Sequence, residues 1–265
     1  MKDLIVVRGG GDIATGTIYK LKQARFNVLV LEVEYPSAIR RNVAFSEAVY
    51  QGEQTIENMT CYKANSIEDA QKLLEKGKLV VLVDEKGESI DYFKPQIVVD
   101  GILAKKNLGT SKTMAPITIA LGPGFEAGVD VDAVIETKRG HNLGRIYYSG
   151  KAIPNTGIPG NIGGYSKERV IHSPAKGILK NVASITDIVK KGDVLATIGE
   201  VEVKATMDGL LRGLIRDGYP VTKGFKIADI DPRLDEINNC FTISDKARCI
   251  AGGVLEAILH LQGEK

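Results

Sequence analysis

Short apolar runs alternate with amphipathic stretches over the first half of the chain. Leu4–Val7 is apolar at every position, which is typical of a strand buried on both faces. Helices are predicted over Ile13–Ala24 and, with Ser66 as its cap, over Ser66–Lys76. Further strands are predicted at Val28–Leu31, Leu79–Val83, Ile97–Val99, Ile117–Leu121 and Ala133–Ile135. This alternation predicts an α/β fold, with a Rossmann-like N-terminal domain and a mostly parallel sheet over residues 1–165.

The second half of the chain has short apolar strands punctuated by glycines, and it repeats itself at an offset of about 32 residues. Gly177 and Gly192 return as Gly209 and Gly224, with matching apolar positions between them. Two such halves resemble the barrel-sandwich hybrid of biotinyl and lipoyl domains, because neither half can bury its apolar face alone. We expect a small all-β barrel over residues 166–235.

This barrel is expected to lack a swinging-arm hairpin. In biotinyl and lipoyl domains the modified lysine lies in a hairpin between the halves, and Lys204 stands at that junction here. Gly209 follows Lys204 too soon for a strand to return from a hairpin tip at about 3.3 Å per residue. The spacing therefore disfavours a biotinyl or lipoyl carrier.

A terminal helix that docks on the first domain is expected within residues 236–265. Gly252 and Gly253 are costly inside a helix, so they predict either a break or a close approach to another backbone.

The turn after the first strand has the form Gly-x-Gly-x-x-Ala, a dinucleotide-binding fingerprint placed between a strand and a helix. The helix N-terminus would offer free N–H groups and a partial positive charge to a phosphate. Glu32 ends the second strand, where an acid binds a ribose hydroxyl group and favours NAD over NADP. A tight turn without a ligand is the alternative. The cofactor-binding residues expected here are Gly9, Gly10, Gly11, Asp12, Ile13, Ala14 and Glu32.

Other loops that follow predicted strands also carry candidate residues. Gly122 and Gly124 come directly after a strand, where open parallel sheets place their ligands. Arg139, His141 and Arg145 lie in a basic loop that could hold a phosphate or carboxylate, or could be a solvated surface loop. The dibasic pair Arg40 and Arg41 could close over the same crevice. No nucleophile and base form a recognisable pair, so no catalytic residue is assigned.

Composition narrows the class of protein. The 265 residues carry a net charge of +2, which gives no reason to expect nucleic acid or a membrane surface as partner. No apolar run is long enough to span a membrane, and a cytoplasmic protein is expected. The cysteines, Cys61, Cys240 and Cys249, form no metal-binding or disulfide pattern, and Cys249 beside Arg248 is either core filler or a reactive thiol.

Nearly the whole chain resembles the YqeB-type accessory proteins of selenium-dependent molybdenum hydroxylase systems. The resemblance rests on the glycine turn 9–16, on segments 36–41 and 43–50, and on the loops 121–128 and 136–145. It implies an accessory or maturation factor with a molybdenum hydroxylase as partner. Because molybdopterin dinucleotide contains a pyrophosphate, it joins an NAD-like molecule as the expected cofactor.

Two further functions stay open at this point. An NAD-dependent oxidoreductase acting on an unknown small substrate would use the same Rossmann-like domain. A protein-interaction module, in which the barrel docks on a partner, is compatible with the accessory role. The oligomeric state is not indicated by the sequence.

Overall fold

A computed structural model describes residues 4–157 and 160–264, which form two compact units. Unit 1 comprises residues up to Pro36, Ala44–Thr156 and the segment from Ile243 onward. Unit 2 comprises Ser37–Val43 and Gly157–Thr242. The domain limits expected from the sequence stay a prediction.

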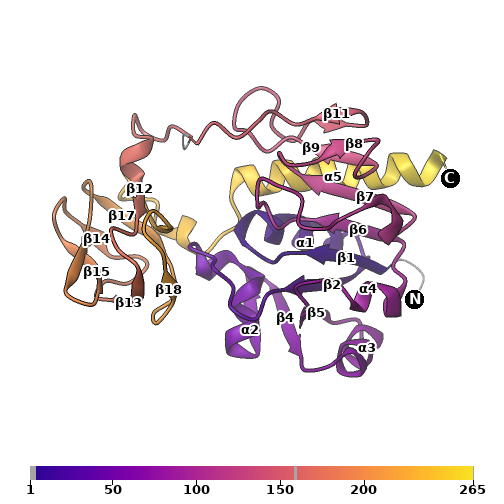
Figure 1. Cartoon of the computed structure of the whole chain (residues 1–265), viewed down its shortest axis with the longest axis horizontal. Coiled ribbons are helices and arrows are strands. Elements are labelled where there is room, and N and C mark those ends of the chain that lie inside the picture. The colour runs from indigo at the N-terminus through magenta and orange to yellow at the C-terminus, as the bar shows by residue number, and fades with distance from the viewer. Residues whose placement is uncertain (1–3, 158–159, 265) are drawn as a thin grey trace. The chain divides into compact units, whose positions relative to one another are not determined.

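The described part of unit 1 contains one nine-stranded sheet (Figure 1). Its strands are β1 (Leu4–Arg8), β2 (Asn27–Glu32), β3 (Glu53–Ile56), β4 (Met59–Ala64), β5 (Leu79–Val83), β6 (Ile97–Asp100), β7 (Ile117–Leu121), β9 (Ala133–Ile135) and β10 (Ile146–Tyr147). Their order is β10-β9-β7-β6-β1-β2-β5-β4-β3. Pairing is parallel from β4 through to β9, and antiparallel for β3 with β4 and for β9 with β10.

The apolar runs form the central strands because helices cover both faces of the sheet. Ile5 and Val7 of β1 face the side covered by α1 (Asp12–Gln23) and α5 (Asp245–Glu264). Leu4 and Val6 face the side covered by α3 (Ile67–Glu75) and α4 (Ser89–Phe93). The strands predicted at Leu79–Val83, Ile117–Leu121 and Ala133–Ile135 are confirmed.

Local signals set the helix ends where the sequence predicts them. The Ser66 hydroxyl group accepts a hydrogen bond from the backbone N–H of Asp69 at 3.2 Å, which caps α3. The shorter helical segments are α2 (Ala48–Gln51) and the 3₁₀ turns Arg41–Val43, Phe45–Glu47, Lys112–Met114, Lys167–Arg169 and Ile237–Cys240.

Helix α5 is continuous through its two glycines and packs tightly on unit 1. A side chain at Gly253 would collide with the carbonyl oxygen of Gly144, so the predicted close approach to another backbone is confirmed. A Cβ at Gly16 of α1 would lie 2.7 Å from Ala247 of α5. Ile250, Val254 and Ile258 of α5 fill the core beneath the sheet. The small sheet of β8 (Glu126–Ala127) and β11 (Gly150–Lys151) completes unit 1.

Unit 2 contains two four-stranded antiparallel sheets. Their orders are β12-β19-β17-β14 and β16-β15-β13-β18. The strands are β12 (Val170–His172), β13 (Gly177–Asn181), β14 (Ile188–Val189), β15 (Val194–Ile198), β16 (Val201–Lys204), β17 (Gly209–Leu214), β18 (Pro220–Val221) and β19 (Lys226–Asp231).

The sequence repeat corresponds to an exchange of strands between the two halves of unit 2. β13 of the first half pairs with β18 of the second, and β14 of the first pairs with β17 of the second. Leu195 and Leu210, one from each half, lie in the same buried cluster. Neither half therefore closes its own core.

The predicted fold class is corrected by these sheets. The large sheet is mixed, with antiparallel strands at both edges, and the connections from β6 to β7 and from β7 to β9 have no α-helix in the described chain. The expected biotinyl/lipoyl-like barrel is replaced by two separate antiparallel sheets, which also recruit β12 and β16 from outside the repeated positions. Apolar runs indicate strands, but not the direction of edge strands or the way in which short strands share sheets.

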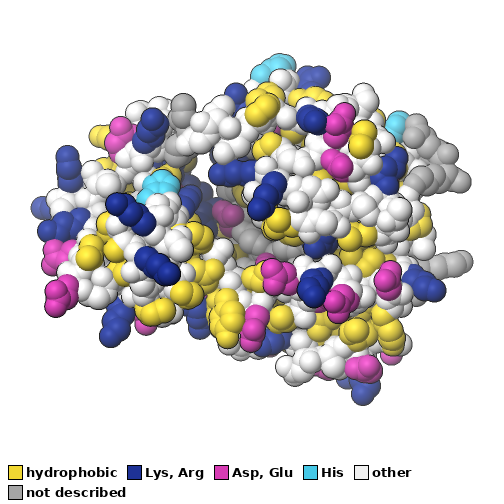
Figure 2. Space-filling view, in the orientation of Figure 1, with side chains coloured by type: hydrophobic (Ala, Val, Ile, Leu, Met, Phe, Trp, Pro, Cys, Tyr) yellow, Lys and Arg dark blue, Asp and Glu magenta, His cyan; other side chains and the backbone are white. Residues whose placement is uncertain are grey.

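None of the helices described is long and apolar enough to cross a membrane. On the face shown in Figure 2, Lys and Arg side chains are interspersed with Asp and Glu side chains.

Candidate functional site

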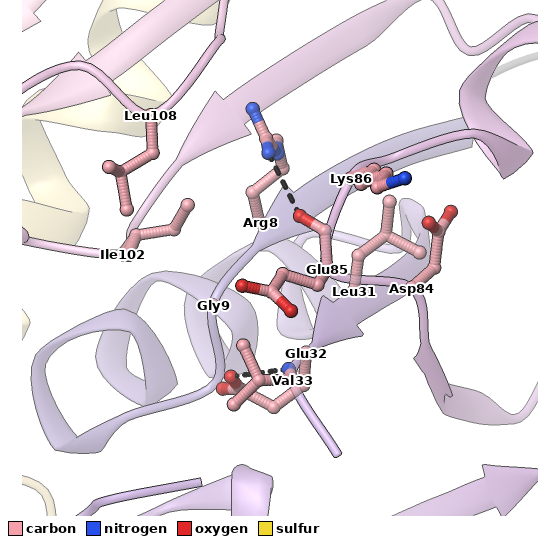
Figure 3. Close-up of a pocket in the computed structure, with 10 residues that line it drawn as sticks. All are labelled: Arg8, Gly9, Leu31, Glu32, Val33, Asp84, Glu85, Lys86, Ile102 and Leu108. Atoms are coloured by element: carbon pink, nitrogen blue, oxygen red, sulfur yellow. Dashed lines mark hydrogen bonds between the residues drawn. The ribbon is translucent and has the colours of Figure 1, made fainter. Parts of the chain in front are cut away.

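A cavity of about 530 Å³ lies at the carboxyl ends of the central strands of unit 1. It opens where β1, β2 and β5 end and where the loop after β6 begins (Figure 3). Open sheets with parallel central strands place their ligands at this edge, where neighbouring connections leave on opposite faces. The lining residues are Arg8, Gly9, Leu31, Glu32, Val33, Asp84, Glu85, Lys86, Ile102 and Leu108.

Arg8 is the last residue of β1, and its side chain is 2% exposed although it lines the cavity. Its Nη1 donates to the hydroxyl group of Thr110 at 2.5 Å, and its Nη2 donates to the carbonyl oxygen of Glu85 at 3.2 Å. Within the described part of the chain, no carboxylate lies within ion-pair distance of this guanidinium group. The cation is therefore held by neutral oxygen atoms.

Asp100 is the register partner of Arg8 on the adjacent strand β6, and it is also buried. Its carboxylate accepts the Thr110 hydroxyl hydrogen at 2.6 Å and the Ile102 N–H at 3.1 Å. Burial raises the pKa of Asp100, while the bond from Thr110 and the nearby Arg8 charge act in the opposite direction. Thr110 thus links the cation to the carboxylate through its hydroxyl group.

The glycine turn is shaped by packing within unit 1. Gly9 has a φ of +91°, and a Cβ there would lie 2.9 Å from Cα of Ile102. A Cβ at Gly10 would lie 3.0 Å from the backbone nitrogen of Ser46, which donates to the Gly10 carbonyl oxygen. Gly11 has open space beside it. Ala14 is buried against Gly101, as its small size in the fingerprint predicts.

Glu32 closes the turn with its own carboxylate. One oxygen accepts the Gly10 N–H at 2.7 Å, and the other accepts the Val33 N–H at 2.9 Å. Burial raises the pKa of Glu32, and the two backbone hydrogen bonds partly offset that effect. At the start of α1, the Asp12 side chain also accepts the N–H of Ile13.

These contacts leave a poor site for a pyrophosphate. The N–H groups of Gly10 and Ile13 are taken by the Glu32 and Asp12 carboxylates, and a phosphate at the turn would be repelled by these like charges. The residues present therefore do not fit an NAD-like molecule or a molybdopterin dinucleotide.

The loop after β5 forms the opposite wall of the cavity. The Asp84 carboxylate accepts the N–H groups of Gly87, Glu88 and Ser89 and the Ser89 hydroxyl hydrogen. Burial alone would raise the pKa of Asp84, but the hydrogen bonds, from Ser89 first, hold it below its usual value. Glu85 and Lys86 are exposed beside it. In Figure 3 the Glu85 carboxylate points toward the middle of the cavity.

The other glycines predicted as cofactor contacts lie in tightly packed loops. A Cβ at Gly122 would lie 2.5 Å from the Thr137 hydroxyl oxygen, and one at Gly124 would lie 2.6 Å from the Lys106 nitrogen. Both glycines have positive φ angles, of +78° and +111°. Packing within unit 1 accounts for both residues.

Hydrogen bonds and an ion pair hold the predicted basic loop, residues 136–145, in place. The buried Glu136 carboxylate accepts the N–H groups of Lys138 and Ile153. Arg139 forms a forked pair with Asp245 at the start of α5, with the shorter contact at 2.7 Å. His141 and Arg145 are exposed, and neither lines the cavity. Their predicted role as an anion cradle is untested.

Arg40 and Arg41 lie in unit 2. Arg40 donates to the carbonyl oxygens of Asn239 and Thr242, and Arg41 donates to that of Leu214. These bonds account for their positions, and neither residue lines the cavity.

Sequence reasoning found Gly9 and Glu32 but missed the polar group around Arg8. An arginine that ends an apolar strand immediately before a glycine turn was an available signal, since charge is rarely placed in a buried strand. Asp100, directly after the predicted strand 97–99, was a second signal. Thr110 and residues 84–86 of the loop after β5 belong to no periodic pattern, so the sequence gives no signal for them.

The cavity is lined by no cysteine, and the described residues form no metal-binding cluster. Among the residues described, no group of three or more His, Cys, Asp or Glu side chains is placed to hold a metal ion. Cys61 and Cys240 are buried, whereas Cys249 is exposed with its Sγ 3.3 Å from the Leu143 carbonyl oxygen.

Comparison with known proteins gives one strong sequence match. The chain is 54% identical over 264 residues to the uncharacterized protein YqeB of Escherichia coli (strain K12). The chain is a relative of YqeB. This match supports the YqeB family expected from the sequence, but the chain spans about half (49%) of that relative's length. No protein-family model matches the chain.

Solved structures resemble the chain only remotely. One is the ectoine utilization protein EutE (DoeB) from Ruegeria pomeroyi, at 15% identity and a TM-score of 0.24, over 87% of this chain and 58% of that one. Another is an aspartoacylase family protein from Mesorhizobium loti, at 14% identity and a TM-score of 0.27, over 87% and 85%. At these scores no activity is carried over to this chain.

The function expected from the sequence is corrected. A nucleotide-binding maturation factor and an NAD-dependent oxidoreductase would both need a glycine turn that is open to a phosphate. Within this chain, the Glu32 carboxylate takes the N–H group that the fingerprint assigned to a phosphate. A strand-turn-helix unit with the right glycines can thus be closed by its own side chain.

Proposed function

We propose that this chain binds a small organic molecule in the cavity at the carboxyl ends of β1, β2 and β5. The observation that carries the proposal is a cavity with a buried guanidinium group on one side and a partly buried carboxyl group on the other. A volume of about 530 Å³ lies within the range typical of small-molecule sites.

The Glu32 carboxyl group supplies one polar contact of the proposed site. Each of its oxygens accepts one backbone N–H, and each oxygen has a second lone pair. A ligand hydroxyl or amino group would donate to one of these.

Apolar side chains supply the rest of the proposed contact surface. Leu31 and Val33 lie on the β2 side, and Ile102 and Leu108 lie on the loop after β6 (Figure 3). Burial of ligand carbon against them contributes about 25 cal/mol per Å² of apolar surface. The proposed ligand therefore has an aliphatic part and at least one hydrogen-bond donor.

Calorimetric titration of the full chain tests this proposal. The probes are leucate, isoleucine, isoamyl alcohol, glucose and NAD, which differ in charge, donors and apolar area. We expect at least one of the aliphatic probes that carry a donor to bind, and Glu32→Ala to weaken that binding about tenfold, as loss of a hydrogen bond to a charged group does. Glu202→Gln, at an exposed glutamate of unit 2, is the matched control and leaves binding unchanged.

The proposal is overturned if none of the four aliphatic or polyol probes binds, or if Glu32→Ala and Glu202→Gln behave alike. Tight binding of NAD would contradict the closed glycine turn.

Three expectations from the sequence stay predictions that the cavity does not address. These are an association with selenium-dependent molybdenum hydroxylases, a cytoplasmic location, and the absence of nucleic-acid or membrane partners. Co-purification of such a hydroxylase with the tagged full chain from its native cell tests the first of them.

A further inference from the structure

We infer that Arg8 binds a carboxylate group of the ligand, so that the cavity selects small monocarboxylates. This inference rests on the proposed function and names the ligand class of the same cavity.

The first reason is the cost of the buried charge. A buried cation is destabilising unless an anion and hydrogen bonds compensate it. Arg8 has only the Thr110 hydroxyl and the Glu85 carbonyl oxygen as direct partners in the described chain, and Asp100 is reached through Thr110. An anion in the cavity would give the guanidinium group the direct counter-charge that it lacks.

The second reason is the number of donors. A guanidinium group has five N–H donors, and each terminal nitrogen carries two of them. The bonds to Thr110 and Glu85 use one hydrogen on Nη1 and one on Nη2. A planar carboxylate matches the fork that remains, because arginine binds carboxylates through two parallel hydrogen bonds.

The third reason is that the fork is held in place. Thr110 accepts from Arg8 and donates to Asp100, and the Asp100 carboxylate is fixed by the Ile102 N–H. Ile102 also lines the cavity. The guanidinium group is therefore oriented before a ligand arrives, which reduces the entropy lost on binding.

Charge placement limits the ligand to one anionic group. Arg8 and Glu32 lie on opposite sides of the cavity, and the Glu85 carboxylate points between them (Figure 3). A second anionic group near the glycine turn would meet these two acids. A hydroxyl or amino group suits the Glu32 side of the cavity. Monocarboxylates with an α-hydroxy or α-amino group and an aliphatic side chain therefore fit both the Arg8 side and the Glu32 side.

Matched ligands test the inference without altering the protein. Isocaproate, isocaproamide and leucate have the same aliphatic skeleton, and the amide replaces the carboxylate with a neutral group of similar shape. In calorimetric titrations of the full chain we expect isocaproate to bind tenfold to a hundredfold more tightly than isocaproamide, on the order of a charged hydrogen-bonded contact. Leucate should bind more tightly still, through Glu32.

Two variants assign the difference to Arg8. Arg8→Gln should make isocaproate and isocaproamide bind equally, and Arg8→Lys should retain only part of the preference, because lysine keeps the charge but loses the fork. Circular dichroism of both variants checks that they are folded. If Arg8→Gln does not fold, the ligand comparison on the unaltered chain and the Arg8→Lys result still decide.

The outcomes separate this inference from the proposed function. Equal binding of isocaproate and isocaproamide to the unaltered chain overturns the role of Arg8 but leaves a small-molecule site in place. Binding of neither these ligands nor the other aliphatic probes overturns both. A carboxylate preference that survives in folded Arg8→Gln also overturns the assignment to Arg8.

Discussion

Arg8 and Asp100 end neighbouring parallel strands in the same register, and the hydroxyl group of Thr110 joins their side chains. Two buried groups of opposite charge thus share one neutral group at the edge of the sheet. Because Thr110 belongs to the loop after β6, this contact also anchors the loop that carries Ile102 and Leu108. The stability of the sheet edge and the shape of the cavity depend on the same hydroxyl group.

Thr110→Val should destabilise the protein by about 1–3 kcal/mol. Valine fills the same space but removes the acceptor for Arg8 and the donor for Asp100, which leaves two buried polar groups without this partner. Urea unfolding measures the change. Thr113→Val, at an exposed threonine of the same segment, is the control and should change stability by less than about 0.5 kcal/mol. Equal effects of the two variants would show that the shared hydroxyl group is unimportant.

The adjacent glycines of α5 should respond to alanine with opposite signs. Gly253→Ala places a methyl group against the Gly144 carbonyl oxygen and should destabilise unit 1 by about 1–3 kcal/mol, the range of overpacked sites. Gly252→Ala meets only the Lys20 amino group, at 3.8 Å, and should stabilise the helix by about 0.5–1 kcal/mol. Thermal unfolding of both variants gives the comparison. A stabilising Gly253→Ala would contradict the close approach of the two backbones.

Glu32 should make the protein less stable as the pH rises from mildly acidic values. The pKa of Glu32 is raised in the folded state. Its contribution to the free energy of unfolding is therefore fully present below its pKa in the unfolded chain, about 4.5, and is lost as the pH rises through its pKa in the folded chain. The unaltered chain should therefore lose stability relative to Glu32→Gln over this interval. Urea unfolding of both proteins at a series of pH values gives the difference.

Asp84 provides an internal control of opposite sign. Its pKa is lowered below 3.8, so its contribution is present above that value and is lost as the pH falls. Relative to Asp84→Asn, the unaltered chain should lose stability on acidification. A Glu32 difference that has the same sign as the Asp84 difference would refute the assigned shift.

The buried pair of Arg169 and Asp229 should show strong coupling in unit 2. Both side chains are less than a tenth exposed, and Arg169 Nη2 contacts both carboxylate oxygens, at 3.0 and 3.2 Å. Arg169→Met should cost about 3–5 kcal/mol because it leaves Asp229 buried without its counter-charge. The double variant with Asp229→Leu should recover most of that loss. A double-mutant cycle by urea unfolding measures the coupling, and additive effects would contradict it.

Patterns in the sequence were enough to place the glycine turn and the parallel strands other than β4, which was missed. Fully apolar runs such as Leu79–Val83 become strands buried on both faces, where burial alone selects the residues. The antiparallel edges were not predicted, because β3 has mostly polar positions and β10 has only two residues, so neither forms a recognisable apolar run, although each pairs with a strand next to it in the chain.

Two of the predicted cofactor-binding residues line the cavity, and the binding role of the whole set stays a prediction. Gly9 and Glu32 do line a cavity, yet Glu32 binds the turn itself. Fingerprint spacing places these residues near one another, but it does not say whether an N–H group faces a ligand or a neighbouring side chain. Arg8 and Asp100 become partners only through strand register, which a single sequence does not specify.

The position of α5 in the core of unit 1 affects the order in which the two units fold during synthesis. Unit 1 needs Ile250, Val254 and Ile258 to fill the space beneath its sheet, whereas all the strands of unit 2 lie between residues 170 and 231. While the ribosome is still adding residues 245–264, the part of this sheet face that α5 covers, over β7 and β9, stays exposed beside α1. We expect unit 2 to fold first, and the nascent first unit to depend on chaperones until α5 emerges.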